Sequence, residues 1–150
     1  MTESKTHEPA GLALTWWIVL APLVVMAIIF ALSSRSSLPD LDGGRGMQNI
    51  AGHFTVYAAL GATLALLFRS LGWRTGRVIL VAIAICVLYG ISDEFHQSFV
   101  PNRSVEGKDI LVDFLGSIAG SVAMLWWIRS RAAASATSDA DPIPPAGENS

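Results

Sequence analysis

Four apolar runs that carry no Asp, Glu, Lys or Arg limit what this chain can fold into. They cover residues 9–34, 46–68, 78–92 and 114–128 of the 150-residue sequence. A helix needs about 20 apolar residues to cross roughly 30 Å of hydrocarbon, and the first two runs are long enough to do so. Only 15% of all residues are charged, against about 25% in an ordinary soluble domain. The pattern therefore predicts an all-α, polytopic membrane protein.

The third and fourth runs are too short for a complete span. Each has 15 residues, which make about 22 Å of helix. The third run reaches a full span only by including the polar segment 93–97, before Pro101 stops the helix. The fourth run does so only by including Asp113 and Asp109. Ionisable side chains are therefore expected at membrane depth, within one or two turns of a helix end.

The sequence predicts a bundle of four transmembrane helices joined by short loops. The expected helices cover about 14–32, 49–70, 77–99 and 109–128, within one transmembrane domain of residues 1–131. The remaining segment, 132–150, is rich in small and polar residues and contains prolines. Such a composition buries too little apolar surface to fold, so we expect a disordered tail.

The distribution of cationic residues and of tryptophans between the two sides indicates the orientation of the four spans in the membrane. Both termini share a side with the connection between the second and third spans, and this side carries six cationic residues against four on the other. The six are Lys5, Arg69, Arg74, Arg77, Arg129 and Arg131, and the four are Arg35, Arg45, Arg103 and Lys108. The positive-inside rule then places both termini in the cytoplasm and the chain in the inner (plasma) membrane. All five tryptophans lie on the side of the termini, where indole rings favour the membrane interface.

Polar residues of three predicted helices gather at the opposite side. They are Asn49, His53 and Tyr57 in the second helix, Asp93, Glu94, His96 and Gln97 in the third, and Asp109 and Asp113 in the fourth. Spacings of three and four residues put these side chains on shared helix faces, except that Glu94 points about 100° away from Asp93. Because the three helix ends lie at one depth, we expect a single polar site. The alternatives are a hydrogen-bonded packing face and a solvated helix end.

The fourth helix aligns its two carboxylates with the Gly-x-x-x-Gly spacing of residues 116–120. This spacing lets membrane helices approach closely, so Asp113 is expected to lie against the second or third helix. Two carboxylates four residues apart repel each other unless a cation, a proton or a hydrogen-bond donor lies between them. Arg103 and Lys108 are the nearest candidates along the chain.

The candidate site residues divide by the chemistry that they permit. Acid–base catalysis suits His53, Asp93, Glu94 and His96, and substrate binding suits Gln97, Arg103, Asp109 and Asp113. Arg103 follows a Pro-Asn turn and is suited either to clamp a carboxylate or phosphate or to anchor the chain at the headgroups. No metal or other cofactor is expected, because the sequence has no H-x-x-x-H, H-E-x-x-H or cysteine pair. No basic run suggests nucleic acid.

Two segments, DEFHQSFVPNR at 93–103 and KDILVDFLGSIAG at 108–120, form a specific pattern, and NIAGHFTVYAALG at 49–61 and FALSSRSSLP at 30–39 form a looser one. Together the four segments resemble the VanZ-like family of bacterial membrane proteins, over about residues 14–128. The chain departs from the family pattern at Asn49-Ile50, where relatives often have Asp-Lys, and at Asn102, where glycine is common. Any salt bridge made by that Asp-Lys pair is therefore absent here.

The resemblance implies a role at the cell envelope. The founding member is associated with resistance to glycopeptide antibiotics, notably teicoplanin, and most relatives have no assigned reaction. We therefore expect an outer-face site that binds or modifies an envelope component, with membrane lipids and a lipid-linked or peptidoglycan-related ligand as partners. One alternative is a non-enzymatic protein whose polar residues only fix helix packing. Another is a small transporter, which the apolar cytoplasmic halves of the last two spans disfavour.

Overall fold

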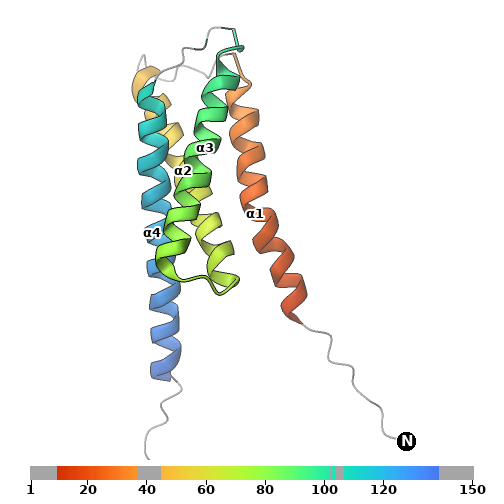
Figure 1. Cartoon of the computed structure of the whole chain (residues 1–150), viewed down its shortest axis with the longest axis vertical. Helices are drawn as coiled ribbons and strands as arrows, with labels where there is room; N and C mark the ends of the chain where they lie inside the picture. The colour runs from red at the N-terminus through yellow and green to blue at the C-terminus, as the bar shows by residue number, and fades with distance from the viewer. Residues whose placement is uncertain (1–9, 37–44, 102, 104–106, 139–150) are drawn as a thin grey trace, which may run out of the picture.

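The computed structural model describes residues 10–36, 45–101, 103 and 107–138. This part of the chain forms four helices and no strand: α1 (Ala10–Ser33), α2 (Arg45–Ser70), α3 (Thr75–Gln97) and α4 (Gly107–Ser138) (Figure 1). Each of the four is long and apolar enough to cross a membrane. The predicted all-α, four-span membrane architecture is confirmed.

The helix ends follow local chemistry more than membrane thickness. Helix α3 ends at Gln97 rather than near 99, and the next residues form i→i−3 bonds from Phe99 N to His96 O and from Val100 N to Gln97 O. Helix α4 continues from its expected end near 128 to Ser138. Residues 132–134 are all alanine, the best helix former, so the helix extends into the segment expected to be disordered. The rest of that predicted tail lies outside the described residues.

The turn between α2 and α3 is tight and internally bonded. Gly72 has a φ of 80°, a left-handed conformation that glycine adopts without steric cost. The Arg69 guanidinium donates to the carbonyl oxygen of Trp73 at 2.7 Å, and the Trp73 ring stacks on Phe68 at 4.7 Å between centroids. This turn therefore holds α2 and α3 antiparallel and adjacent.

Helices α2 and α4 make the most extensive contact in the described part of the bundle. Gly116 and Gly120 of α4 face the backbone of Phe54 and Ala58, and Gly61 of α2 faces the backbone of Ser117. A Cβ atom at any of these glycines would overlap the opposing backbone. Glycine therefore lets the two backbones touch, as the Gly-x-x-x-Gly spacing suggests.

The buried apolar core runs between α2, α3 and α4, and α1 covers part of it. Its fully or nearly buried members are Ile29, Tyr57, Leu60, Leu64, Ala65, Val78, Ala82, Cys86 and Leu125. The Tyr89 hydroxyl donates to the Met26 carbonyl oxygen at 2.7 Å and so links α3 to α1. Figure 1 shows α1, in orange and red, leaning away from the other helices toward its N-terminal end. Its apolar side chains there, such as Trp17 and Leu23, are exposed and suited to lipid contact.

The helix ends that carry the candidate site residues lie together at one end of the bundle. The last turns of α1 and α3 and the first turns of α2 and α4 all lie at the top of Figure 1. We call this end, formed by residues 33–36, 50–53, 93–101, 103 and 107–113, the polar end. The α2–α3 turn and the C-terminal part of α4 lie at the opposite end, as do the tryptophans.

Candidate functional site

The polar end holds two clusters of buried polar side chains, on two faces of α3. The His53 cluster consists of His53, Glu94, Asp109 and Asp113, and the Asp93 cluster consists of Ser33, Asp93 and Gln97. All seven side chains are buried. The sequence suggested a single site, and the structure instead divides the polar residues between the α2–α4 side and the α1 side of α3.

His53 of α2 lies between the two carboxylates of α4. Its Nδ1 is 2.9 Å from Asp113 Oδ1, and its Nε2 is 4.0 Å from Asp109 Oδ2. An ionised carboxylate can only accept a hydrogen bond, so Nδ1–H donates to Asp113 and Nε2 is turned toward Asp109. The two carboxylates therefore have a buried imidazole from another helix between them, a partner that the sequence analysis did not name.

Glu94 of α3 completes the His53 cluster. One ligand-type atom from each of His53, Glu94 and Asp109 lies within 4.8 Å of the other two. Glu94 is only 3% exposed. The angle of about 100° between neighbouring residues on a helix explains why Glu94 faces α2 and α4 while Asp93 faces α1.

Tyr57 and Gly90 lie one turn deeper than His53. The Tyr57 ring is parallel to the His53 imidazole within 3°, with 6.3 Å between centroids, so the two residues share a helix face as their spacing predicts. The Tyr57 hydroxyl and Asp113 Oδ2 lie 3.6 and 3.0 Å from the point that a Cβ on Gly90 would occupy. Within the described residues, neither oxygen has a hydrogen-bond partner. The missing side chain at Gly90 therefore lets these two buried polar atoms lie close to the α3 backbone.

The Asp93 cluster ties the end of α1 to α3. Ser33 Oγ donates to Asp93 Oδ2 at 2.8 Å, and Gln97 Nε2 donates to the same oxygen at 2.8 Å. Gln97 Nε2 also lies 3.3 Å from Ser33 Oγ. Ser33 was not among the predicted site residues. Its signals were the pair of serines where the first apolar run ends and its place in the segment FALSSRSSLP.

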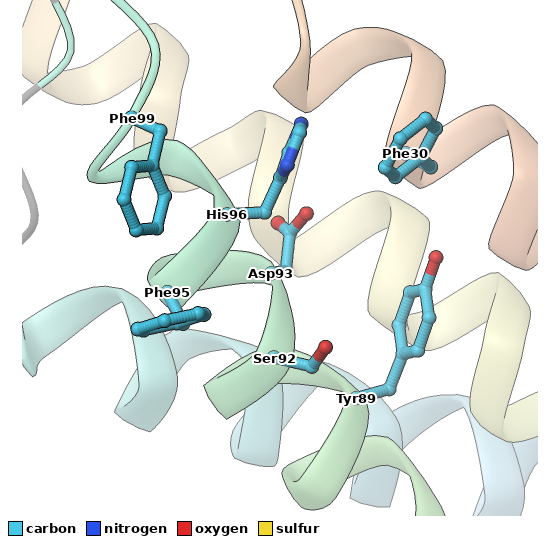
Figure 2. A pocket seen from close by; sticks show the side chains of 7 residues that line it. All are labelled: Phe30, Tyr89, Ser92, Asp93, Phe95, His96 and Phe99. Carbon is cyan, nitrogen blue, oxygen red and sulfur yellow. The ribbon is translucent and has the colours of Figure 1, made fainter.

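A cavity of about 360 Å³ opens between α1 and α3 beside the Asp93 cluster. Its lining residues are Phe30, Tyr89, Ser92, Asp93, Phe95, His96 and Phe99. Figure 2 shows Asp93, His96 and Tyr89 reaching from α3 toward α1, with Phe95 and Phe99 on the other side. His96 Nε2 is 3.1 Å from Ser34 Oγ, and its ring lies 4.7 Å from the Phe30 ring. The cavity therefore combines aromatic surface with groups that can donate, accept or transfer a proton.

The remaining polar residues of the prediction lie after α3 and at the starts of α4 and α2. Arg103 is half-buried in the turn after α3, where its backbone N–H donates to Val100 O at 3.2 Å. Lys108 is exposed at the start of α4. The side chain of Asn49, the first member of the predicted α2 stripe, lies outside the described side chains. The anion clamp expected of Arg103 stays a prediction.

Replacing Ser33 with alanine should loosen α1. The change removes a hydrogen bond to a buried carboxylate, a contact that typically contributes about 1.5–3 kcal/mol. Thermal unfolding in detergent measures the effect. Ser36→Ala is the matched control, because Ser36 is exposed just beyond the end of α1 and its loss should change stability by less than about 0.5 kcal/mol. Equal stability of the two variants would contradict the importance of the α1–α3 link.

Comparison with protein-family models matches residues 6–129 to the VanZ/LLP1 family. The matched range contains every residue of both clusters and of the cavity. No curated protein and no solved structure gave a significant match.

Proposed function

This chain belongs to the VanZ/LLP1 family, and from that premise we propose that it binds a lipid or lipid-linked component of the cell envelope at its polar end. The observation that carries the proposal is the cavity between α1 and α3. Its volume of about 360 Å³ falls within the range of about 300–1,000 Å³ common for small-molecule sites.

The cavity suits an amphipathic molecule. Phe95 and Phe99 are 68% and 71% exposed near the end of a membrane-spanning helix, where they are suited to contact acyl or isoprenoid chains. Asp93 and His96, on the adjoining wall, offer hydrogen-bonding groups to a polar head. A lipid entering sideways from the bilayer would thus meet apolar contacts along its chain and polar contacts at its head.

The proposal places the polar end at the outer face of the inner membrane. The excess of Lys and Arg on the side of the termini supports this orientation. Lipid-linked precursors of peptidoglycan are then the ligands of greatest interest. His96 and Asp93 are the proposed contact residues. His53 and Glu94 are proposed as further acid–base groups, and Gln97, Arg103, Asp109 and Asp113 as groups that bind or position the ligand.

Lipids that copurify with the protein test the proposal. Native mass spectrometry of the purified wild type should detect a retained envelope lipid, and His96→Ala and Asp93→Asn should each lower its occupancy by about tenfold, the effect of losing about 1.4 kcal/mol of binding. Leu80→Ala is the matched control, since Leu80 is 70% exposed on the same helix but distant from the cavity. Equal occupancy in all four proteins would overturn the proposal.

A link to glycopeptide resistance is the finer part of the proposal. A deletion strain complemented with wild-type or Asp93→Asn protein should differ in teicoplanin susceptibility, and lipid and muropeptide profiles should change in parallel. Unchanged susceptibility and profiles, with the protein inserted at normal levels, would count against an envelope role.

The Asp93 cluster itself favours a second candidate, a protein whose polar residues serve only to fix helix packing. Ser33, Asp93 and Gln97 already satisfy one another across two helices. In that case Asp93→Asn would lower the melting temperature and abundance while leaving lipid occupancy per folded molecule unchanged. A transporter is not favoured, because buried charged side chains in the described part of the chain are confined to the polar end.

A further inference from the structure

The geometry points to a divalent metal site formed by His53, Glu94 and Asp109, with Asp113 orienting the imidazole. The three ligand residues come from α2, α3 and α4, and one N or O atom from each lies within 4.8 Å of the others. Ligand atoms about 2.0–2.2 Å from one ion lie at most about 4.4 Å apart. His53 Nε2 and Asp109 Oδ2, at 4.0 Å, already meet that condition, and a sub-ångström shift of the side chains brings the full set within it.

The other nitrogen of His53 supports the assignment. Nδ1 is held by Asp113 Oδ1 at 2.9 Å, which leaves Nε2 directed at Asp109. Metal-binding histidines almost always donate their second ring N–H to a carboxylate or carbonyl, which fixes the tautomer and the ring orientation. Asp113 comes from a position 60 residues away along the chain and lies outside the ligand set. It is therefore a positioning residue.

Two buried polar atoms without a hydrogen-bond partner in the described part of the chain lie beside the His53 cluster. The Tyr57 hydroxyl and Asp113 Oδ2 belong to side chains that are 0% and 1% exposed. Both lie beside Gly90 and lack a hydrogen-bond partner within the described residues. Such groups are nearly always satisfied by protein, water or an ion. The cluster thus resembles a site that is completed by a bound ion and its water.

The charges and the donor types define the class of ion. Glu94 and Asp109 are 3% and 1% exposed inside membrane-spanning helices, and their carboxylate oxygens are ligands that suit divalent ions. One imidazole with two carboxylates suits Zn²⁺ or Mn²⁺ better than Ca²⁺ or Mg²⁺, and three protein ligands leave a position open for water.

Metal titration of the purified full-length protein tests the inference directly. After treatment with EDTA, the protein in detergent is given Zn²⁺, Mn²⁺, Mg²⁺ or Ca²⁺, desalted and analysed for bound metal and for thermal unfolding. We expect one equivalent of Zn²⁺ or Mn²⁺ per chain and a rise in Tm of about 5–10 °C at 100 times the Kd. Folded wild type that retains none of the four ions overturns the site.

Variants separate this site from adventitious binding. His53→Asn and Asp109→Asn should abolish stoichiometric binding, and Asp113→Asn should weaken it by about 10–100-fold. His96→Asn, which removes the imidazole of the cavity instead, should bind metal like the wild type. If a ligand variant fails to fold, X-ray absorption of the wild-type metal complex decides the question. Scattering from one imidazole and from oxygen ligands supports the site, and a shell without imidazole overturns it.

Discussion

Gly120→Ala is expected to destabilise the bundle by about 3 kcal/mol or more, the upper range for overpacking. The new Cβ would overlap the backbone of Ala58 in α2, and a backbone cannot rotate away as a flexible side chain can. Helices α2 and α4 would have to separate along their most extensive contact. Since the two helices carry His53 and both α4 carboxylates, the His53 cluster would be lost with them. Unfolding in mixed detergent micelles, with membrane abundance measured beside it, gives the result.

Gly52→Ala is the matched control for that experiment. Gly52 is also a glycine inside a helix, but a Cβ there would meet nothing within 4 Å. Alanine is a better helix former than glycine, so the free energy of unfolding of this variant should rise by about 0.5–1 kcal/mol. A Gly120→Ala protein as stable as Gly52→Ala would show that the helices do not approach as closely as described.

Asp113→Ala should have the second largest effect. We expect it to lower the free energy of unfolding by about 3 kcal/mol, measured with EDTA present. Removing one partner of a buried hydrogen bond leaves the other partner unsatisfied, which typically costs about 1–3 kcal/mol and more for charged groups. His53 would be that partner, because Asp113 Oδ1 lies 2.9 Å from its Nδ1 and both side chains are buried.

A double-mutant cycle isolates this contact. His53→Ala and Asp113→Ala should be non-additive, with a coupling energy of about 1–3 kcal/mol. Asp113→Ala combined with Ser70→Ala is the control, because Ser70 is exposed at the far end of α2 and should be additive within about 0.5 kcal/mol. Additivity of the His53 and Asp113 changes would contradict the hydrogen bond.

The fold was largely predictable because the apolar runs mark the helices that cross the membrane. The number of spans followed from the four runs, and the start of the α2–α3 turn followed from the end of the second run at Phe68 and Arg69. The end of α4 was missed, since lipid thickness does not limit a helix whose next residues are alanine. Local helix propensity decided that boundary.

Which residues gather at the polar end was also predictable, but how they divide into the His53 cluster and the Asp93 cluster was not. Periodicity gives the angle between Asp93 and Glu94 on α3. It does not give the rotation of α3 relative to α1 and α4, which depends on tertiary packing. That rotation sends Asp93 to Ser33 and Glu94 to His53. Ligand-type side chains that come together from three helices also escape any search for closely spaced metal ligands.

Two contributors carried almost no sequence signal. Gly90 matters because it has no side chain beside Tyr57 and Asp113, and nothing in the sequence marks which glycine of a membrane helix faces a polar group. Ser33 matters because it is the last residue of α1 and lies beside Asp93. Contacts of this kind become visible only once the helices are placed together.

Side-specific labelling of single cysteines tests the central claim, that the polar groups of separate helices meet at one end of the bundle and face the cell exterior. In a background with buried Cys86 replaced by serine, the variants are Ser36→Cys, Ser98→Cys and Gly107→Cys at the polar end and Thr75→Cys at the other, all at exposed positions. A membrane-impermeant maleimide should label the first three in intact spheroplasts and the fourth only after permeabilisation. Labelling of any polar-end cysteine from the opposite side to the other two would contradict the claim.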